Sequence, residues 1–168
     1  MPKRIQFPTG FYQPYQFLRK KNFQKIQRQI AGKEWHQAWS LSGNKVIASH
    51  FVTAITDSDV IDMVQVPTVY RYRVDWWFDK IQISKYPAGS FFDWHDDRSN
   101  RKSRYSRRLT VLISSLTDPQ DSRIQTQQGD YVLAKGEAIY FPAEDPYKII
   151  GPSSGEYLLL TIWGMQNV

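Results

Sequence analysis

The chain has 168 residues, which is enough for one domain with a buried core. It contains no cysteine, which excludes disulfide frameworks, zinc–cysteine sites and thiol nucleophiles. Its net charge of +6 favours anionic partners without selecting one. No apolar run is long enough to span a membrane, and no apolar segment follows the basic N-terminus as it would in a signal peptide. We therefore expect a single cytoplasmic domain over residues 1–168, with no membrane partner.

The first part of the chain predicts a loop and then a helix. Residues 1–13 are expected to form a loop or an edge extension. Pro14 in a first turn and Gly32 just past the end favour a helix to about Ile30. Its apolar stripe consists of Phe23, Ile26 and Ile30. Basic residues occupy much of the rest, which is more typical of a solvated face than of a nucleic-acid contact. They are Arg19, Lys20, Lys21, Lys25 and Arg28.

Residues 33–80 combine turn, helix and strand signals. A hairpin is expected within 33–52, turning at Ser42-Gly43-Asn44. Thr56-Asp57-Ser58-Asp59 is typical of a helix N-cap, and Pro67 ends the helix that follows. Strong alternation predicts a strand over 69–78.

The second half of the chain predicts short strands separated by turns. Residues 98–108 hold six basic residues and no acid, and they indicate a mobile loop, while 117–128 indicate a polar loop. Many short strands behind one helical region imply a mainly β jelly-roll backed by N-terminal helices. The expected strands cover residues 81–86, 109–116, 131–133, 138–141, 147–150 and 157–163.

The stretch from Ile83 to Asp97 carries the candidate chemistry. It predicts a strand, a Pro/Gly turn and a second strand that ends in His95-Asp96-Asp97. Since residues two apart on a strand share a side, His95 and Asp97 are expected to point to one place. An imidazole and a carboxylate are two of the three ligands of the facial triad that suits non-haem Fe(II). The alternative interpretation is a hydrogen-bonded pair at a strand end.

The same stretch resembles a known family. Tyr86, Gly89, His95 and Asp97, in the pattern Y-x-x-G-x-x-x-x-x-H-x-D, resemble the start of the double-stranded β-helix in Fe(II)/2-oxoglutarate dioxygenases of the prolyl-4-hydroxylase type. The resemblance implies a cupin-like core over 81–168, with helices and flanking strands in 1–80. It also implies Fe(II) and 2-oxoglutarate as cofactors, with Tyr86 contacting 2-oxoglutarate. Further similar segments are Arg108-Leu109-Thr110, Gln128-Gly129-Asp130, residues 135–142, and Gly155-Glu156-Tyr157 with Trp163.

Two positions that carry chemistry in that family differ in this chain. The distal histidine ligand falls at Tyr147, and the Arg or Lys that pairs with 2-oxoglutarate falls at Tyr157. No histidine follows His95, so the family's triad is incomplete. Asp145, Glu144 or a deprotonated Tyr147 could supply the missing ligand. Both tyrosines could instead be cavity fillers.

Other residues could compensate for these changes. Lys148, Lys135 or a basic residue of 98–108 could supply the positive charge that pairs with 2-oxoglutarate. His36 and His50 are expected to be ordinary surface or core residues, with His50 on the metal as the alternative.

Three function hypotheses follow. In the first, Fe(II) on His95, Asp97 and a third donor supports hydroxylation of a peptide side chain, a nucleobase or a small molecule. In the second, the fold is a degenerate, inactive module for binding or structure. In the third, the Arg98–Arg108 loop and the 19–28 helix face bind nucleic acid or another polyanion. For the first hypothesis, the expected dry pocket is lined by Phe91, Trp94 and Trp163.

Overall fold

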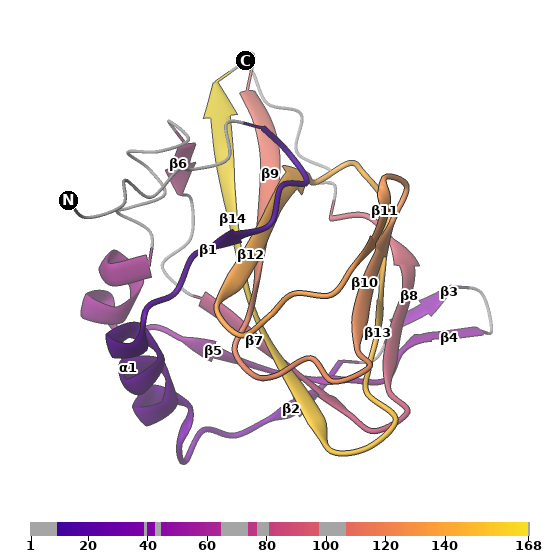
Figure 1. Ribbon diagram of the computed structural model, residues 1–168, viewed down its shortest axis with the longest axis horizontal. Coiled ribbons are helices and arrows are strands. Elements are labelled where there is room, and N and C mark those ends of the chain that lie inside the picture. The colour runs from indigo at the N-terminus through magenta and orange to yellow at the C-terminus, as the bar shows by residue number, and fades with distance from the viewer. Residues whose placement is uncertain are drawn as a thin grey trace.

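The computed structural model describes residues 10–38, 40–42, 45–64, 74–76, 81–97 and 107–167. These residues form two antiparallel sheets, with two helices beside one of them (Figure 1). The second helix covers residues 58–64. The labelled elements are β1 (Tyr15–Gln16), α1 (Lys20–Ile30), β2 (His36–Gln37), β3 (Ser40–Ser42), β4 (Lys45–Ala48), β5 (Phe51–Ile55), β6 (Val74–Trp76), β7 (Ile81–Pro87), β8 (Phe91–His95), β9 (Arg107–Ser115), β10 (Arg123–Thr126), β11 (Gly129–Tyr131), β12 (Glu137–Pro142), β13 (Tyr147–Ile150) and β14 (Glu156–Asn167).

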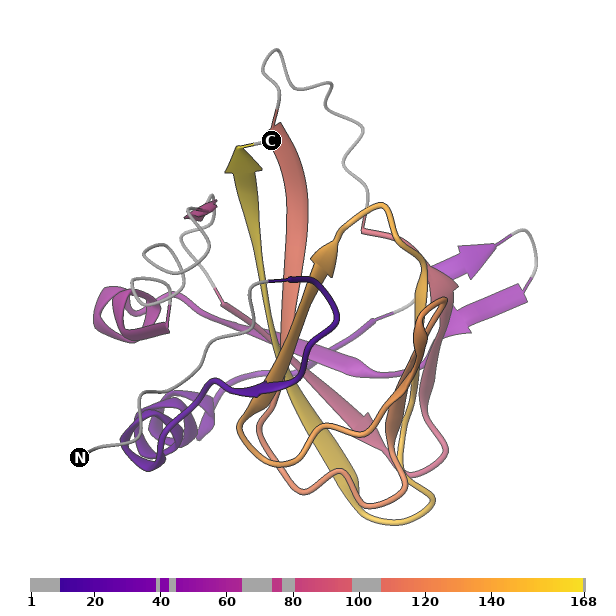
Figure 2. The same ribbon diagram turned by 45° about the horizontal axis from the view of Figure 1, so that its top comes forward.

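The two sheets interleave strands from distant parts of the chain. The larger has the order β1-β12-β9-β14-β7-β5-β2, with β6 also paired to β14. The smaller has the order β11-β10-β13-β8-β4-β3. Figures 1 and 2 show the smaller sheet on the side away from the helices. This arrangement is a double-stranded β-helix, so the predicted mainly β jelly-roll with N-terminal helices is confirmed.

Alternation along the strands sorts the apolar side chains into two clusters. On β9, Val111 and Ile113 join the cluster between the sheets, whereas Leu112 joins the cluster under the helices. On β14, Leu159 points inward and Leu160 points toward the helices in the same way. The inner cluster therefore surrounds whatever side chains the smaller sheet directs inward.

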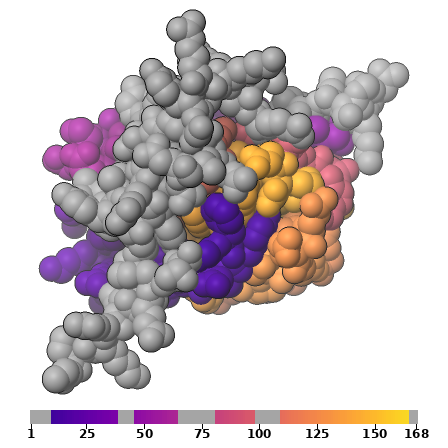
Figure 3. All heavy atoms as spheres, turned by 90° about the horizontal axis from the view of Figure 1, so that it is seen from above, coloured from indigo at the N-terminus to yellow at the C-terminus, as the bar shows by residue number. Residues whose placement is uncertain are grey.

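Helix α1 begins later than the sequence predicts. Tyr15 and Gln16 pair with Ala138 and Glu137 as β1, and the helix starts only at Lys20. The predicted start at Pro14 is wrong because sheet pairing with a strand more than a hundred residues away outweighs the local proline signal. Figure 3 shows the N-terminal segment lying against later strands of the chain.

The other features predicted for α1 are confirmed. Ile26 is buried, and Phe23 and Ile30 pack against the same cluster. Gly32 follows the helix with φ of +80°, a conformation that glycine adopts without strain. The basic side chains are exposed at Arg19, Lys20, Lys21, Lys25 and Arg28.

Two further local predictions are confirmed. Oδ1 of Asp57 accepts a hydrogen bond from the Val60 amide at 3.1 Å, as an N-cap does. Strands β3 and β4 pair as an antiparallel hairpin. The turn residues Gly43 and Asn44 lie outside the described residues, as does Pro67.

Several predicted boundaries are corrected. Residues 117–128 are not all loop, because β10 inserts between β11 and β13 and buries Ile124. The predicted strand at 131–133 is instead β11, which ends at Tyr131. Of the basic segment 98–108, Arg107 and Arg108 belong to β9, while 98–106 lie outside the described residues.

The predicted strand at 69–78 is described only as β6, residues 74–76. Within the described residues, every helix is too short or too polar to cross a bilayer.

Candidate functional site

Strand β8 and the segment after it carry the candidate metal ligands. His95 ends β8 directly opposite Tyr147 of β13. Two residues later, the Asp97 amide donates a hydrogen bond to the carbonyl of Ala143 at 2.8 Å, which holds the chain in place beyond the strand. The side chains of His95 and Asp97 thus come to lie beside each other, as the alternation predicts.

The His95 imidazole has one occupied and one free nitrogen. Its Nδ1 lies 2.7 Å from the carbonyl oxygen of Asp93, and because a carbonyl only accepts, Nδ1 carries the proton. Nε2 therefore presents a lone pair, and it is buried with no hydrogen-bond partner. Burial lowers the pKa of His95 below its usual value, against the opposing effects of the Asp93 hydrogen bond and the Asp97 charge. A neutral imidazole fixed in this tautomer is the form that binds metals.

The Asp97 carboxylate is oriented by two donors. Its Oδ2 accepts hydrogen bonds from the Tyr147 hydroxyl at 2.7 Å and from Nε1 of Trp163 at 3.1 Å. Its Oδ1 lies 3.6 Å from Nε2 of His95. Ligand atoms about 2.0–2.2 Å from a shared cation lie roughly 2.8–3.6 Å apart at right-angled to tetrahedral geometry. The observed separation lies at the upper end of that range.

Tyr147, at the place of the distal histidine, acts as a donor. Its ring is buried, and burial together with the Asp97 charge raises the pKa of its hydroxyl well above the ordinary value. It is therefore a neutral phenol that keeps its proton and donates a hydrogen bond to Asp97.

Asp145 lies in a different contact. Its Oδ2 accepts a hydrogen bond from the Tyr12 hydroxyl at 2.7 Å. Within the part of the chain that the structure describes, there is no group of three His, Cys, Asp or Glu side chains placed to hold a metal. The structure thus joins His95, Asp97 and Tyr147 and leaves Asp145 apart.

Tyr86 and Tyr157, the candidate residues for 2-oxoglutarate, face each other across β7 and β14. Both are buried. Burial raises the pKa of Tyr157 to about 12, against an opposing effect of the Ser115 side chain. Burial and the Asp97 charge raise the pKa of Tyr86 well above its ordinary value. Two neutral phenols therefore line the region where the resembled family carries a cation.

Two lysines that could replace the family's Arg or Lys make other contacts. Nζ of Lys148 is 3.6 Å from Oδ1 of Asp93. Nζ of Lys135 lies over the Phe23 ring beside α1, 5.0 Å from its centroid. Candidates within 98–106 lie outside the described residues.

The predicted pocket lining is corrected at two positions. Trp163 does contact Asp97, but Trp94 is 47% exposed and faces outward. Phe92 rather than Phe91 packs against the inner cluster and stacks on His95, with ring centroids 3.4 Å apart. Phe92 takes the place expected for Phe91 because the register shifts between β8 and β13. Trp94 faces outward because it directly precedes the inward-facing His95 on the strand.

His50, expected from the sequence to be an ordinary surface or core residue with metal binding as the alternative, lies against the candidate site. It is buried and stacks on Tyr86 and Phe92, with ring centroids 4.6 and 5.0 Å away. Its Nδ1 has no hydrogen-bond partner. Burial, with a smaller effect of His95, lowers its pKa to about 4. His50 directly precedes β5, and the pairing of β5 with β7 brings its ring onto Tyr86.

The architecture is that of the 2-oxoglutarate/Fe(II) oxygenases. A prolyl-4-hydroxylase from Pseudomonas putida is 16% identical with a TM-score of 0.63, over 95% of this chain and 94% of that one. A viral collagen prolyl hydroxylase from Paramecium bursaria Chlorella virus-1, solved with 2-oxoglutarate, is 17% identical with a TM-score of 0.62, over 95% and 98%. A 2OG-Fe(II) oxygenase family oxidoreductase from Burkholderia pseudomallei is 12% identical with a TM-score of 0.63, over 88% and 79%.

The sequence comparisons are negative. No protein-family model matches the chain, and no curated protein matches it. The structural likeness, at 12–17% identity in these three cases, establishes the fold.

Proposed function

We propose that this chain binds Fe(II) between His95 and Asp97 and uses 2-oxoglutarate to hydroxylate a substrate. The observation that supports this proposal is the buried, unpartnered Nε2 of His95, 3.6 Å from Oδ1 of Asp97. Leaving a buried polar atom unsatisfied costs about 1–3 kcal/mol, and a bound cation would remove that cost. The likeness of the fold to 2-oxoglutarate/Fe(II) oxygenases raises the prior for this chemistry.

The residues present fit such a metal at two positions. Nε2 of His95 and Oδ1 of Asp97 supply one nitrogen and one oxygen donor, which suit iron. A metal held by these two side chains would remain accessible to 2-oxoglutarate, O2 and water. When bound, iron and 2-oxoglutarate supply the O2 activation needed to hydroxylate a C–H bond.

The surrounding side chains orient the ligands and keep the site dry. Tyr147 and Trp163 hold Oδ2 of Asp97, which leaves Oδ1 to face His95. Buried Tyr86 and Tyr157 would donate hydrogen bonds to 2-oxoglutarate where the resembled family uses a cation. Two neutral donors bind a carboxylate less strongly than a bidentate guanidinium does. We therefore expect a weak affinity for 2-oxoglutarate.

Metal titration tests this proposal. Mn(II), which resists oxidation, is titrated into wild type, His95→Ala and Asp97→Asn, with His36→Ala as the matched control on an exposed residue of β2. The proposal expects saturable binding that both site variants lose and that His36→Ala retains. Release of succinate from 2-oxoglutarate with Fe(II), absent in His95→Ala, tests turnover.

A second candidate function is an inactive binding or structural module with the oxygenase fold. The observation that favours it is the hydrogen bond from Tyr147 to Asp97, which satisfies the carboxylate without any metal. This function predicts no His95-dependent metal binding and an unchanged melting temperature when Mn(II) is added. The same titration therefore distinguishes the two candidates.

A further inference from the structure

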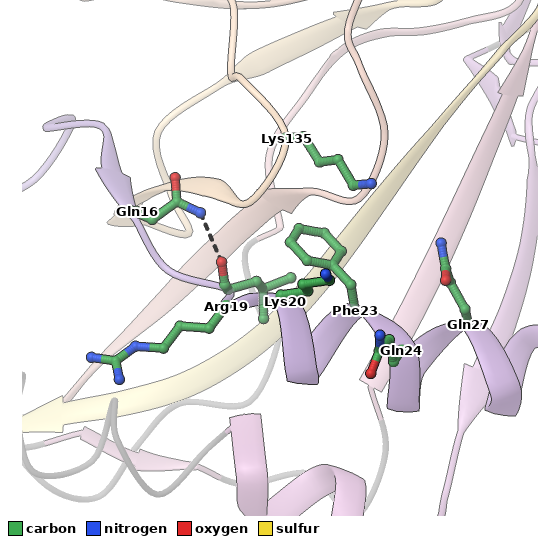
Figure 4. Close-up of a pocket in the computed structure, with 8 residues that line it drawn as sticks. Gln16, Arg19, Lys20, Phe23, Gln24, Gln27 and Lys135 are labelled. Carbon is green, nitrogen blue, oxygen red and sulfur yellow. Dashed lines mark hydrogen bonds between the residues drawn. The ribbon is translucent and has the colours of Figure 1, made fainter.

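A basic groove lies on the outer side of the molecule, beside α1. Its volume is about 540 Å³, within the range of ligand-binding clefts. Figure 4 shows it between the helix and the turn that carries Lys135. Its lining consists of Gln16, Leu18, Arg19, Lys20, Phe23, Gln24, Gln27 and Lys135.

All the charged residues that line this basic groove are positive. Its charged lining residues are Arg19, Lys20 and Lys135, and the lining includes no carboxylate. The first turn of α1 also has no acidic residue. All three cationic side chains are exposed, and no ion pair with another described residue neutralises them. The groove therefore attracts anions.

The wall that carries Lys135 is held in place by the backbone. The Gly136 carbonyl accepts hydrogen bonds from the amides of Phe17 and Leu18 at 2.8 and 3.0 Å. The Gly136 amide donates to the carbonyl of Ser115 at 2.8 Å. Lys135 is thus presented by a fixed turn, with its ammonium over the Phe23 ring. A preformed wall reduces the entropy that a ligand must lose on binding.

The three cationic side chains do not converge on one point. In Figure 4, Arg19 extends from one end of the groove, while Lys135 reaches over Phe23 from the opposite wall. Separated cations fit a ligand with several spaced charges better than a single phosphate group. The uncharged polar and aromatic lining consists of Phe23, whose ring offers an aromatic surface, and the carboxamides of Gln16, Gln24 and Gln27.

We propose that this groove binds single-stranded nucleic acid. Phosphates would pair with Arg19, Lys20 and Lys135, because spaced cations along a groove follow a phosphodiester backbone. Carboxamides donate and accept hydrogen bonds at base edges, and a phenyl ring contacts a base face. An acidic protein segment would supply the negative charge, but it has no nucleobases for the carboxamides and the Phe23 ring to contact. This inference does not depend on the His95–Asp97 site.

Fluorescence anisotropy tests the proposal with a fluorescein-labelled oligouridylate of about 12 nucleotides, a length within the span of single-strand sites. The variant is Arg19→Gln/Lys20→Gln/Lys135→Gln. Loss of three phosphate contacts should reduce the slope of log affinity against log salt by about two, and weaken binding about 100-fold in 0.1 M salt.

A matched control separates the groove from net charge. Lys21→Gln/Lys25→Gln/Arg28→Gln removes the same charge from exposed positions of the same helix outside the groove. This control should stay within about threefold of wild type, since non-contacting charges act only through screened, long-range attraction. Equal losses in both variants would overturn the proposal, as would oligouridylate binding no tighter than polyglutamate of the same length. His95→Ala should bind the oligonucleotide like wild type.

Discussion

The hydroxyl of Tyr147 donates a hydrogen bond to Oδ2 of Asp97 across 2.7 Å, from the position directly opposite His95 on the neighbouring strand. Its pKa is raised by burial and by the Asp97 charge, so the phenol stays protonated. The place that holds a histidine ligand in the resembled family therefore carries a proton donor. The candidate metal site is left with two protein ligands and a third position beside them.

Replacing Tyr147 with histidine should strengthen metal binding. The new imidazole would enter from β13 next to Asp97 and offer the missing nitrogen. We expect Mn(II) affinity in Tyr147→His to rise by at least about 10- to 100-fold, the scale on which supporting residues around a metal act. Isothermal titration calorimetry measures the change.

Tyr147→Phe is the control for this substitution. It keeps the ring in the inner cluster and removes only the hydroxyl. It should bind Mn(II) no more tightly than wild type. Equal affinities of the His and Phe variants would mean that position 147 does not face the cation.

Asp97 and Asp145 should respond differently to neutralisation. Asp97→Asn removes the charge that faces His95 and should abolish Mn(II) binding. Asp145→Asn should leave that binding intact, because this carboxylate is engaged by Tyr12. Its unfolding free energy should fall by roughly 1 kcal/mol, since a charge-assisted hydrogen bond becomes a neutral one. Parallel titrations and urea unfolding measure both effects. Loss of metal binding in Asp145→Asn would place that residue at the site.

The sequence predicts those features that depend on local spacing. The two-residue period of a strand predicts the convergence of His95 and Asp97, although β8 ends at His95 and the hydrogen bond of the Asp97 amide to Ala143 holds Asp97 in place. The Asp57 cap follows from the geometry of a helix start. The fold class follows from many short strands and from the resemblance that begins at Tyr86. These signals need no knowledge of which segments meet in space.

The features that the sequence does not predict depend on distant partners. Tyr15 forms a strand rather than a helix because Ala138 pairs with it. The polar segment containing Ile124 becomes a strand because β11 and β13 flank it. His50 enters the site because β5 pairs with β7, which brings its ring onto Tyr86. Local propensity is a weak guide where such tertiary pairing decides the outcome.

His50 should make stability depend on pH. Its folded-state pKa of about 4 lies below the usual 6.5, because burial disfavours the charged imidazole. Its neutral form therefore supports the fold fully above pH 6.5, and that support is lost as the pH falls toward 4. The loss is at most about 3 kcal/mol, from 1.36 kcal/mol per unit of pKa shift.

Urea unfolding between pH 7 and pH 4 checks this expectation. His50→Phe keeps a ring between Tyr86 and Phe92 and should lose less stability over that interval than wild type. His36→Gln, at an exposed position, should follow the wild-type profile. Identical profiles for wild type and His50→Phe would show that burial does not lower the pKa of His50 in the folded protein.

Gly136→Ala should destabilise the protein more than Gly32→Ala. Both glycines have positive φ, +88° and +80°, where a side chain costs about 1–2 kcal/mol. At Gly32 an added Cβ meets nothing within 4 Å. At Gly136 it would overlap the Gln16 side chain and lie 2.9 Å from the carbonyl oxygen of Leu18. Because backbone cannot yield as a side chain can, the second variant should lose roughly a further 1–3 kcal/mol.

Urea unfolding of the two variants measures the difference. The larger loss in Gly136→Ala should come with weaker oligonucleotide binding. The turn that the new side chain displaces carries Lys135, which lines the basic groove. Gly32→Ala should leave oligonucleotide binding unchanged, because Gly32 follows the other end of α1. If both variants lost the same stability, the turn at Gly136 would be free to move away from Leu18, and the groove wall would not be preformed.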